Sequence, residues 1–163
     1  MELTPNRQVT ADGSYGLHRV PRSPVSQTSS SAALIIAIAA GSAVGGVARF
    51  VLSTVVQDRW STSFPAGTLV VNVLGCIALG FISYLVLETG EFSPTTRALL
   101  TTGFCGGFTT FSTFAMETIR AAEEGAWQRA MLYVGSSVIT GLAGILIGAA
   151  AARQVLSIIR RMA

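Results

Sequence analysis

The chain has 163 residues, of which 50% are hydrophobic and only 12% are charged. Soluble proteins are about one quarter charged, so this composition argues against an ordinary soluble domain and indicates a lipid bilayer as the surroundings. All eleven basic residues are arginine, so the lysine of a Walker phosphate-binding motif is absent. The arginines are also scattered between apolar runs, which argues against a nucleic-acid partner.

The first 31 residues are rich in Ser, Thr, Pro, Gly and Arg and contain no apolar block, a composition typical of a disordered tail. The first apolar block begins at Ala32 and is longer than the core of a signal peptide, so we expect it to remain in the mature protein. We therefore expect a tail over 1–31, a four-helix transmembrane domain over 32–152, and a short C-terminal tail over 153–163.

Four apolar runs are each long enough to cross a hydrocarbon core, which takes a helix of about 20 residues. The predicted spans are 32–56, 65–87, 94–119 and 130–152. A buried soluble bundle is the alternative, but its helices would carry a polar stripe facing water, and these runs are apolar around most of their circumference. The connections are too short for a soluble catalytic domain, so we expect no enzyme and a function within the membrane.

Smaller patterns predict how the spans begin and pack. Ser93 followed by Pro94 is typical of a capped helix start. Cys76 and Cys105 both lie inside spans, where two free thiols are expected rather than a disulfide. Small residues recur every four positions in two spans, which predicts close helix contact. These residues are Ala37, Gly41 and Gly45 in the first span, and Gly144, Gly148 and Ala152 in the last.

The third span contains the segment 103–114, GFCGGFTTFSTF, whose glycines and β-branched threonines have low helix propensity. We expect an interruption of the helix near Gly106 to Thr110. A break at mid-depth frees backbone carbonyls, which protein, water or an ion must satisfy, so it often marks an ion site or a cavity. A glycine-rich packing notch is the alternative that composition leaves open.

Aromatic and polar side chains accompany the expected break. Phe111 and Phe114 are three apart and share a helix face, and the electropositive edge of a phenyl ring can meet an anion. Thr109, Ser112 and Thr113 add hydroxyl donors beside the rings. Asn72 adds an amide one turn after Thr68 in the second span. These groups form a possible polar track for a small anion, although packing of the rings and a helix–helix hydrogen bond from Asn72 are the simpler alternatives.

Arg49 lies within an otherwise apolar stretch of the first span. An ionisable residue inside a membrane is a functional hypothesis by default, and here it predicts attraction of anions into a vestibule. The alternative is an arginine whose long side chain reaches back to the membrane surface.

The strings GSAVGGVARF, GTLVVNVLG and GFCGGFTTFSTFAME, in this order on three successive spans, closely resemble the small fluoride channel family called Fluc or CrcB. The third string is the most specific, and the resemblance covers about 32–152. It implies an all-α membrane protein of four transmembrane helices with a broken third helix, assembled as an antiparallel, dual-topology dimer. It also implies passive export of fluoride through two pores and a structural sodium ion at the centre.

Carried over by motif position, the resemblance assigns a role to each candidate residue. Gly106 and Thr109 would hold sodium through their backbone carbonyls, and Arg49 would face a vestibule. The fluoride pore would be lined by Asn72, Phe111, Phe114, Thr68, Ser112, Thr113 and Ser137. The chain is expected to be a multi-pass protein of the inner (plasma) membrane. It would form a homodimer or a heterodimer with a paralogous subunit.

Two other functions remain as alternatives. A small proton-coupled multidrug exporter also has four spans, but it needs a protonatable residue at mid-membrane. Glu88 and Glu117 are the nearest acids, and both are expected at span ends. A structural membrane protein would need only the strips of small residues, and it would leave the break and the polar track unexplained.

Overall fold

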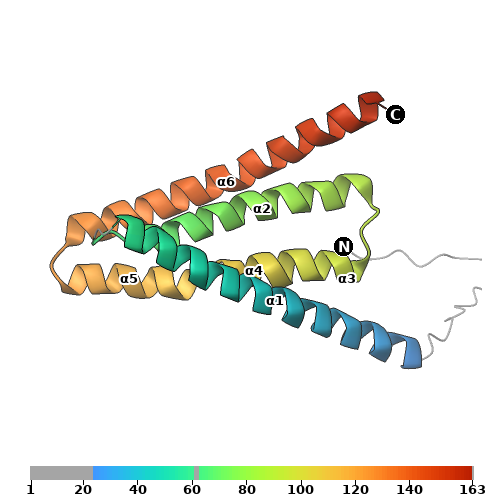
Figure 1. Ribbon diagram of the computed structural model, residues 1–163, viewed down its shortest axis with the longest axis horizontal. Coiled ribbons are helices and arrows are strands. Elements are labelled where there is room, and N and C mark those ends of the chain that lie inside the picture. The colour runs from blue at the N-terminus through green and yellow to red at the C-terminus, as the bar shows by residue number, and fades with distance from the viewer. Residues whose placement is uncertain (1–23, 61–62, 163) are drawn as a thin grey trace, which may run out of the picture. The chain divides into compact units, whose positions relative to one another are not determined.

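The computed structural model describes residues 24–60 and 63–162, with side chains described from Ser31 onward. Contacts divide the chain between Ser31 and Ala32, and the account below concerns the second unit, 32–163. Regular structure in the described part is helical throughout (Figure 1). The elements are α1 (Pro24–Trp60), α2 (Ala66–Thr89), α3 (Pro94–Ala98), the π-helix η1 (Leu99–Cys105), α4 (Gly106–Phe108), α5 (Phe111–Glu123) and α6 (Trp127–Met162).

Three of the described helices are long and apolar enough to cross a membrane: Ser31–Trp60 within α1, then α2, then α6. Two are longer than predicted, since α1 already begins at Pro24 and α6 continues to Met162 through the expected C-terminal tail. Residues 1–23 of the expected N-terminal tail lie outside the described residues. The third predicted span, 94–119, is a succession of short helices, namely α3, η1, α4 and α5, which follow one another along one line in Figure 1.

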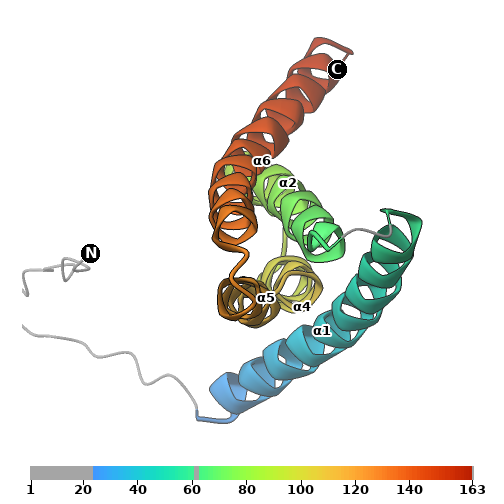
Figure 2. The same cartoon turned by 90° about the vertical axis from the view of Figure 1, so that its left-hand side faces the viewer.

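Helices α2 and α6 lie side by side and run in the same direction (Figures 1 and 2). Small residues allow this close approach: a Cβ added to Gly148 would lie 2.0 Å from the carbonyl oxygen of Ile77, and one added to Gly144 would lie 3.2 Å from the Cβ of Cys76. Ala152 is fully buried. The predicted strip of small residues in the last span is therefore confirmed.

Helix α1 packs through its own strip of small residues against η1 and α4. A Cβ on Gly41 would lie 2.4 Å from the carbonyl oxygen of Leu99, and one on Gly45 would lie 2.3 Å from that of Phe104. The Ser42 hydroxyl between them donates to the Gly103 carbonyl at 3.4 Å. The predicted packing role of this strip is confirmed, and it holds α1 against the segment just before the break.

The start and the interruption of the third span agree with their sequence signals. Ser93 accepts a hydrogen bond from the Thr96 amide, and Pro94 occupies the first turn of α3. Helix α4 ends at Phe108, Thr109 and Thr110 are extended, and α5 begins at Phe111. Gly106 was expected within the interruption, but it is helical, so the break is shorter than the predicted stretch. The π-helix before it was not predicted.

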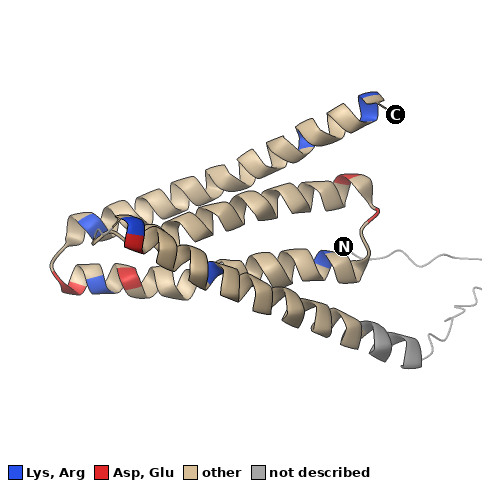
Figure 3. Cartoon of the chain, in the orientation of Figure 1, with Lys and Arg blue, Asp and Glu red and all other residues tan. Residues whose placement is uncertain are grey.

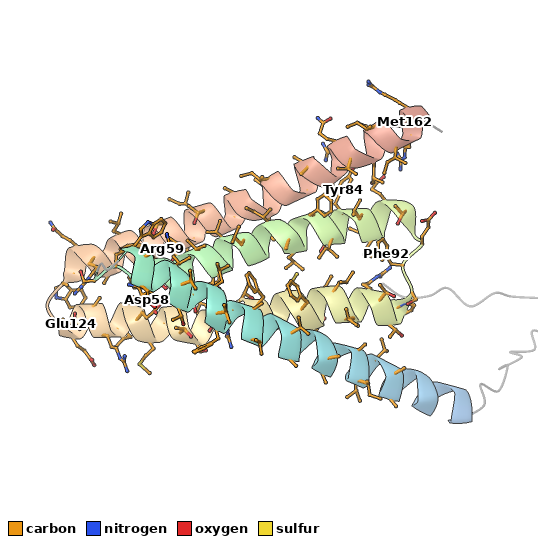
Figure 4. The ribbon with its side chains drawn as sticks, in the orientation of Figure 1. Asp58, Arg59, Tyr84, Phe92, Glu124 and Met162 are labelled. Atoms are coloured by element: carbon orange, nitrogen blue, oxygen red, sulfur yellow. The ribbon has the colours of Figure 1, made fainter. Side chains whose placement is uncertain are left out.

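Most of the described charged residues lie towards the two ends of the helices, and one basic residue of α1 lies between these ends (Figure 3). Asp58, Arg59 and Glu124 mark one end, and Tyr84 and Met162 lie towards the other (Figure 4). Between these ends the outer faces carry large apolar side chains. More than half of the surface of Ile36, Phe50, Leu142 and Leu146 is exposed. Such a surface is suited to lipid or to a partner helix rather than to water.

Candidate functional site

The second residue of the break, Thr110, is held from the neighbouring helix α2. Asn72 Oδ1 accepts the Thr110 N–H at 2.7 Å, and Asn72 Nδ2 donates to the Thr110 carbonyl at 3.1 Å. Thr110 is buried, with 8% of its surface exposed. Both backbone groups of this extended residue are thus satisfied by one side chain, as burial in an apolar medium requires.

The side chain of Thr110 then starts the next helix. Its Oγ1 accepts the Thr113 N–H at 3.2 Å, which caps α5, and it also lies 3.0 Å from Thr113 Oγ1 and 3.3 Å from Ser112 Oγ. The hydroxyls of Ser112 and Thr113 are therefore engaged with the cap. Thr110 was not among the predicted site residues, although a threonine just before an apolar helix is a capping signal that could have identified it.

A cavity of about 350 Å³ lies on one side of the break, and we call it the Phe cavity. It brings together six of the predicted residues: Asn72, Gly106, Thr109, Phe111, Phe114 and Ser137. The ring centroids of Phe111 and Phe114 are 5.6 Å apart, and 79% of the Phe111 surface is exposed. None of the described residues that line this cavity is acidic or basic.

Ser137 contributes a hydroxyl from α6 to the surroundings of the Phe cavity. Its Oγ is buried and has no hydrogen-bond partner among the described residues. A buried hydroxyl without a partner is uncommon in proteins, because its desolvation is then uncompensated. The Ser137 hydroxyl is therefore a buried donor that the described residues leave unused.

Two polar cavities lie on the other side of the break. The larger, about 590 Å³, is lined by Glu117, Arg120, Glu124 and Arg129 together with Gln57 and Asp58, and we call it the Glu117 cavity. The smaller, about 230 Å³, is lined by Arg49, Phe50, Val71 and Thr110, and we call it the Arg49 cavity. Ser53, Thr68 and Thr113 line both, so the two adjoin. Thr110 lines both the Arg49 cavity and the Phe cavity, so the break separates them.

Glu117 is a residue whose contacts the sequence did not reveal. It was expected at a span end, and the contacts that its carboxylate makes there between α2 and α6 were not predicted: it accepts hydrogen bonds from Thr68 Oγ1 at 2.9 Å and from Tyr133 OH at 2.7 Å. Only 5% of Thr68 and 1% of Tyr133 are exposed. The Thr68 hydroxyl, predicted as a donor in the pore, is therefore directed to this carboxylate.

Arg49 reaches from α1 toward the break. Its Nη1 donates to the Thr109 carbonyl at 3.5 Å, and the residue is half-buried. The guanidinium is thus directed inward, to the lining of the Arg49 cavity, and away from the helix end that a snorkelling arginine would seek. This orientation is compatible with the predicted vestibule role.

The predicted sodium ligands differ in how well they fit an ion. In a continuous helix the Gly106 carbonyl would accept the Thr110 N–H, but that N–H binds Asn72, so the oxygen loses its helical donor. Gly106 is also exposed. The Thr109 carbonyl already accepts a bond from Arg49 and retains one lone pair. The Gly106 oxygen therefore suits a hard cation better than the Thr109 oxygen, which is already bound by a positively charged guanidinium.

Comparison with known proteins assigns the chain to a family. The family model described as CrcB-like protein, camphor resistance (CrcB), matches residues 36–149. A fluoride-specific ion channel FluC of Roseiflexus sp. (strain RS-1) is 48% identical over 119 residues, 73% of this chain and 96% of that protein. Proteins of the same name are 42% identical in Hydrogenovibrio crunogenus and 46% identical in Chlorobaculum tepidum, over 76% and 70% of this chain and 93% and 90% of theirs.

Proposed function

The chain belongs to the CrcB-like family, and from this premise we propose that it is a subunit of a fluoride-selective channel that lets fluoride leave the cell passively. The names of its relatives support the choice of ion. The observation that carries the proposal is the Phe cavity, which brings an amide, hydroxyls and two ring edges together without any charged lining residue among those described. No covalent chemistry is involved.

Conduction of a small anion requires groups that replace its water without binding it too tightly. Neutral N–H and O–H donors and the electropositive edges of Phe111 and Phe114 meet this requirement, because each contributes only a partial charge. The N-terminal end of α5 adds the positive end of a helix dipole beside Phe111. An arginine in the same place would hold the anion more strongly and slow its release.

We propose that the succession α3, η1, α4 and α5 forms the fourth membrane crossing, and that a second, inverted subunit completes each pore. The exposure of Gly106 supports a partner on this face, because backbone carbonyls that have lost their helical donors are costly to leave facing lipid. The partner is a second copy or a paralogous chain. The inner (plasma) membrane is the proposed location, with the chain crossing it several times.

We also propose that a sodium ion is bound through the carbonyls of Gly106 and Thr109. When bound, the ion would supply positive charge to oxygens that the break has deprived of helical donors. It would be structural, so prolonged removal of sodium should stop fluoride flux, and full flux in rigorously sodium-free buffer would contradict this part of the proposal.

The proposed function can be tested in cells that have lost their own fluoride export. Expression of the chain should restore growth in fluoride medium, because passive export lowers the internal concentration. The same cells in an equal concentration of chloride provide the control for osmotic effects. Growth in fluoride no better than that of cells with an empty vector would contradict the proposal.

A proton-coupled exporter is a second candidate, because Glu117 is a half-buried carboxylate within the helices. Coupling would require this group to gain and lose a proton. Glutamine retains the shape and can still bind Thr68 and Tyr133, but it cannot titrate. We expect Glu117→Gln to retain fluoride flux, as should the control Glu124→Gln at an exposed ion pair. Loss of flux in Glu117→Gln alone would favour the exporter.

A further inference from the structure

The side chain of Asn72 uses both an acceptor and a donor on one residue of the break, and a role as anion donor does not require this. The two bonds, 2.7 Å and 3.1 Å long, pair the amide with the N–H and carbonyl of Thr110, as a neighbouring β-strand would. We propose that Asn72 is a positioning residue: it sets where the third span stops and restarts, and so places Phe111 and Gly106.

The physical argument begins with competition for one N–H. In an uninterrupted helix the Thr110 N–H would bind the Gly106 carbonyl four residues earlier. Thr110 is almost fully buried, so water cannot easily satisfy its backbone groups if they leave the helix. Asparagine offers one donor and one acceptor in the geometry of a peptide group. Asn72 therefore supplies the acceptor and the donor that make the extended conformation of Thr110 favourable relative to the helical one.

Three features of the site follow from this contact. The Gly106 carbonyl is left without its helical donor, and Thr110 Oγ1 is placed to cap α5 through Thr113. Phe111, the next residue, then becomes the first of α5, which fixes the start of the face that carries both rings. One amide hydrogen of Asn72 remains, and the residue lines the Phe cavity, so the positioning role is compatible with contact to the anion.

Amide exchange measured by ¹⁵N NMR on the full chain in detergent micelles tests this proposal without any fluoride. In the native chain the Thr110 amide should exchange more slowly than that of Phe111, which begins a helix and has no helical acceptor. In Asn72→Ala the Thr110 amide should exchange about tenfold faster or more, the effect of losing one hydrogen bond. In Asn72→Asp it should stay slow, because an acceptor oxygen remains in either protonation state, although fluoride flux should fall.

Ser137→Ala is the matched control, since it removes a donor near the same cavity without touching Thr110. It should leave the exchange of Thr110 unchanged. The proposal is overturned if Thr110 exchanges as fast as Phe111 in the native chain, or no faster in Asn72→Ala. If Asn72→Ala does not fold, the exchange rate of the Thr110 amide in the native chain and in Asn72→Asp still tests the proposal, because fast exchange in either would overturn it. The role in conduction rests on the proposed function, but slow Thr110 exchange without fluoride flux would contradict only that function.

Discussion

At the scale of single residues, selectivity for a small anion depends on groups that carry partial charges. The Phe cavity supplies them from three helices: the amide of Asn72 on α2, the rings of Phe111 and Phe114 on α5, and the hydroxyl of Ser137 on α6. A full positive charge, Arg49, lies on the other side of the break, in an adjoining polar cavity. In the proposed channel, this division would separate attraction of the ion from its passage.

Replacement of either phenylalanine by leucine tests the role of the ring edges. Phe111→Leu and Phe114→Leu keep apolar bulk but remove the electropositive edge. We expect folded dimers whose fluoride flux falls by about tenfold or more, which corresponds to ~1.4 kcal/mol in the barrier. Phe104→Leu is the control, because its ring stacks on Phe108, 5.7 Å away, and does not line the Phe cavity. Native flux in both cavity variants would refute the ring hypothesis.

Sequence spacing located some of these residues and could not locate others. Phe111 and Phe114 are neighbours because three positions on a helix bring side chains to one face, so their contact was predictable. The bond from Thr68 to Glu117 joins residues 49 positions apart, and that from Asn72 to Thr110 joins residues 38 apart. No local pattern encodes such pairs. The hydroxyl of Thr68 was therefore predicted as a pore donor without knowledge of the carboxylate that binds it, whereas Ser112 and Thr113 contact Thr110, which a local capping signal could have identified.

At the scale of elements, the break is surrounded by rigid packing. Glycines on α1 let η1 and α4 approach backbone to backbone just before the break. Asn72 on α2 holds the extended residue itself. The freed backbone groups thus lie in a fixed frame, which is the condition for irregular backbone at membrane depth.

A pair of adjacent glycines tests the packing of α1. In Gly45→Ala the new Cβ would lie 2.3 Å from the Phe104 carbonyl oxygen, whereas at Gly46 it meets no atom within 4 Å. We expect Gly45→Ala to destabilise the fold by about 1–3 kcal/mol, as overpacking does. Gly46→Ala should be neutral or slightly stabilising. Thermal unfolding in detergent measures both, and equal midpoints for the two variants would show that the close approach is not needed.

The elements themselves were largely readable from the sequence. The lengths of the apolar runs predicted the three long helices, and the recurring small residues predicted the packing faces. Ser93 with Pro94 predicted the start of the third span. The break was predicted from its glycines, but it lies at Thr109 and Thr110, because Asn72 selects the position. The π-helix over 99–105 has no sequence signature that we could use, since it differs from an α-helix only in which carbonyl each N–H binds.

At the scale of the whole molecule, an inverted pair made of two copies of this chain requires that the chain insert in both directions. Insertion follows the distribution of arginine. Among described residues, one end carries Arg97, Arg153, Arg160 and Arg161, and the other carries Arg59, Arg120 and Arg129. Four against three is a small difference. Arg7, Arg19 and Arg22 lie outside the described residues.

Labelling from one side of the membrane measures this orientation. A cysteine introduced as Ser157→Cys near the end of α6 should react in only part of the molecules when intact cells are treated with an impermeant reagent. The parent chain, with only Cys76 and Cys105 within the helices, is the control for background labelling. Complete labelling or none at all would contradict dual insertion, and would favour pairing with a paralogous subunit of opposite orientation.

Fluoride conduction itself is measured most directly with the purified chain in liposomes. Vesicles loaded with potassium fluoride and treated with a potassium ionophore should release fluoride rapidly to an external fluoride electrode, because the ionophore removes the opposing membrane potential. The same vesicles loaded with potassium chloride should release almost none. Fluoride release at the rate of protein-free vesicles, or chloride release as fast as that of fluoride, would contradict the account.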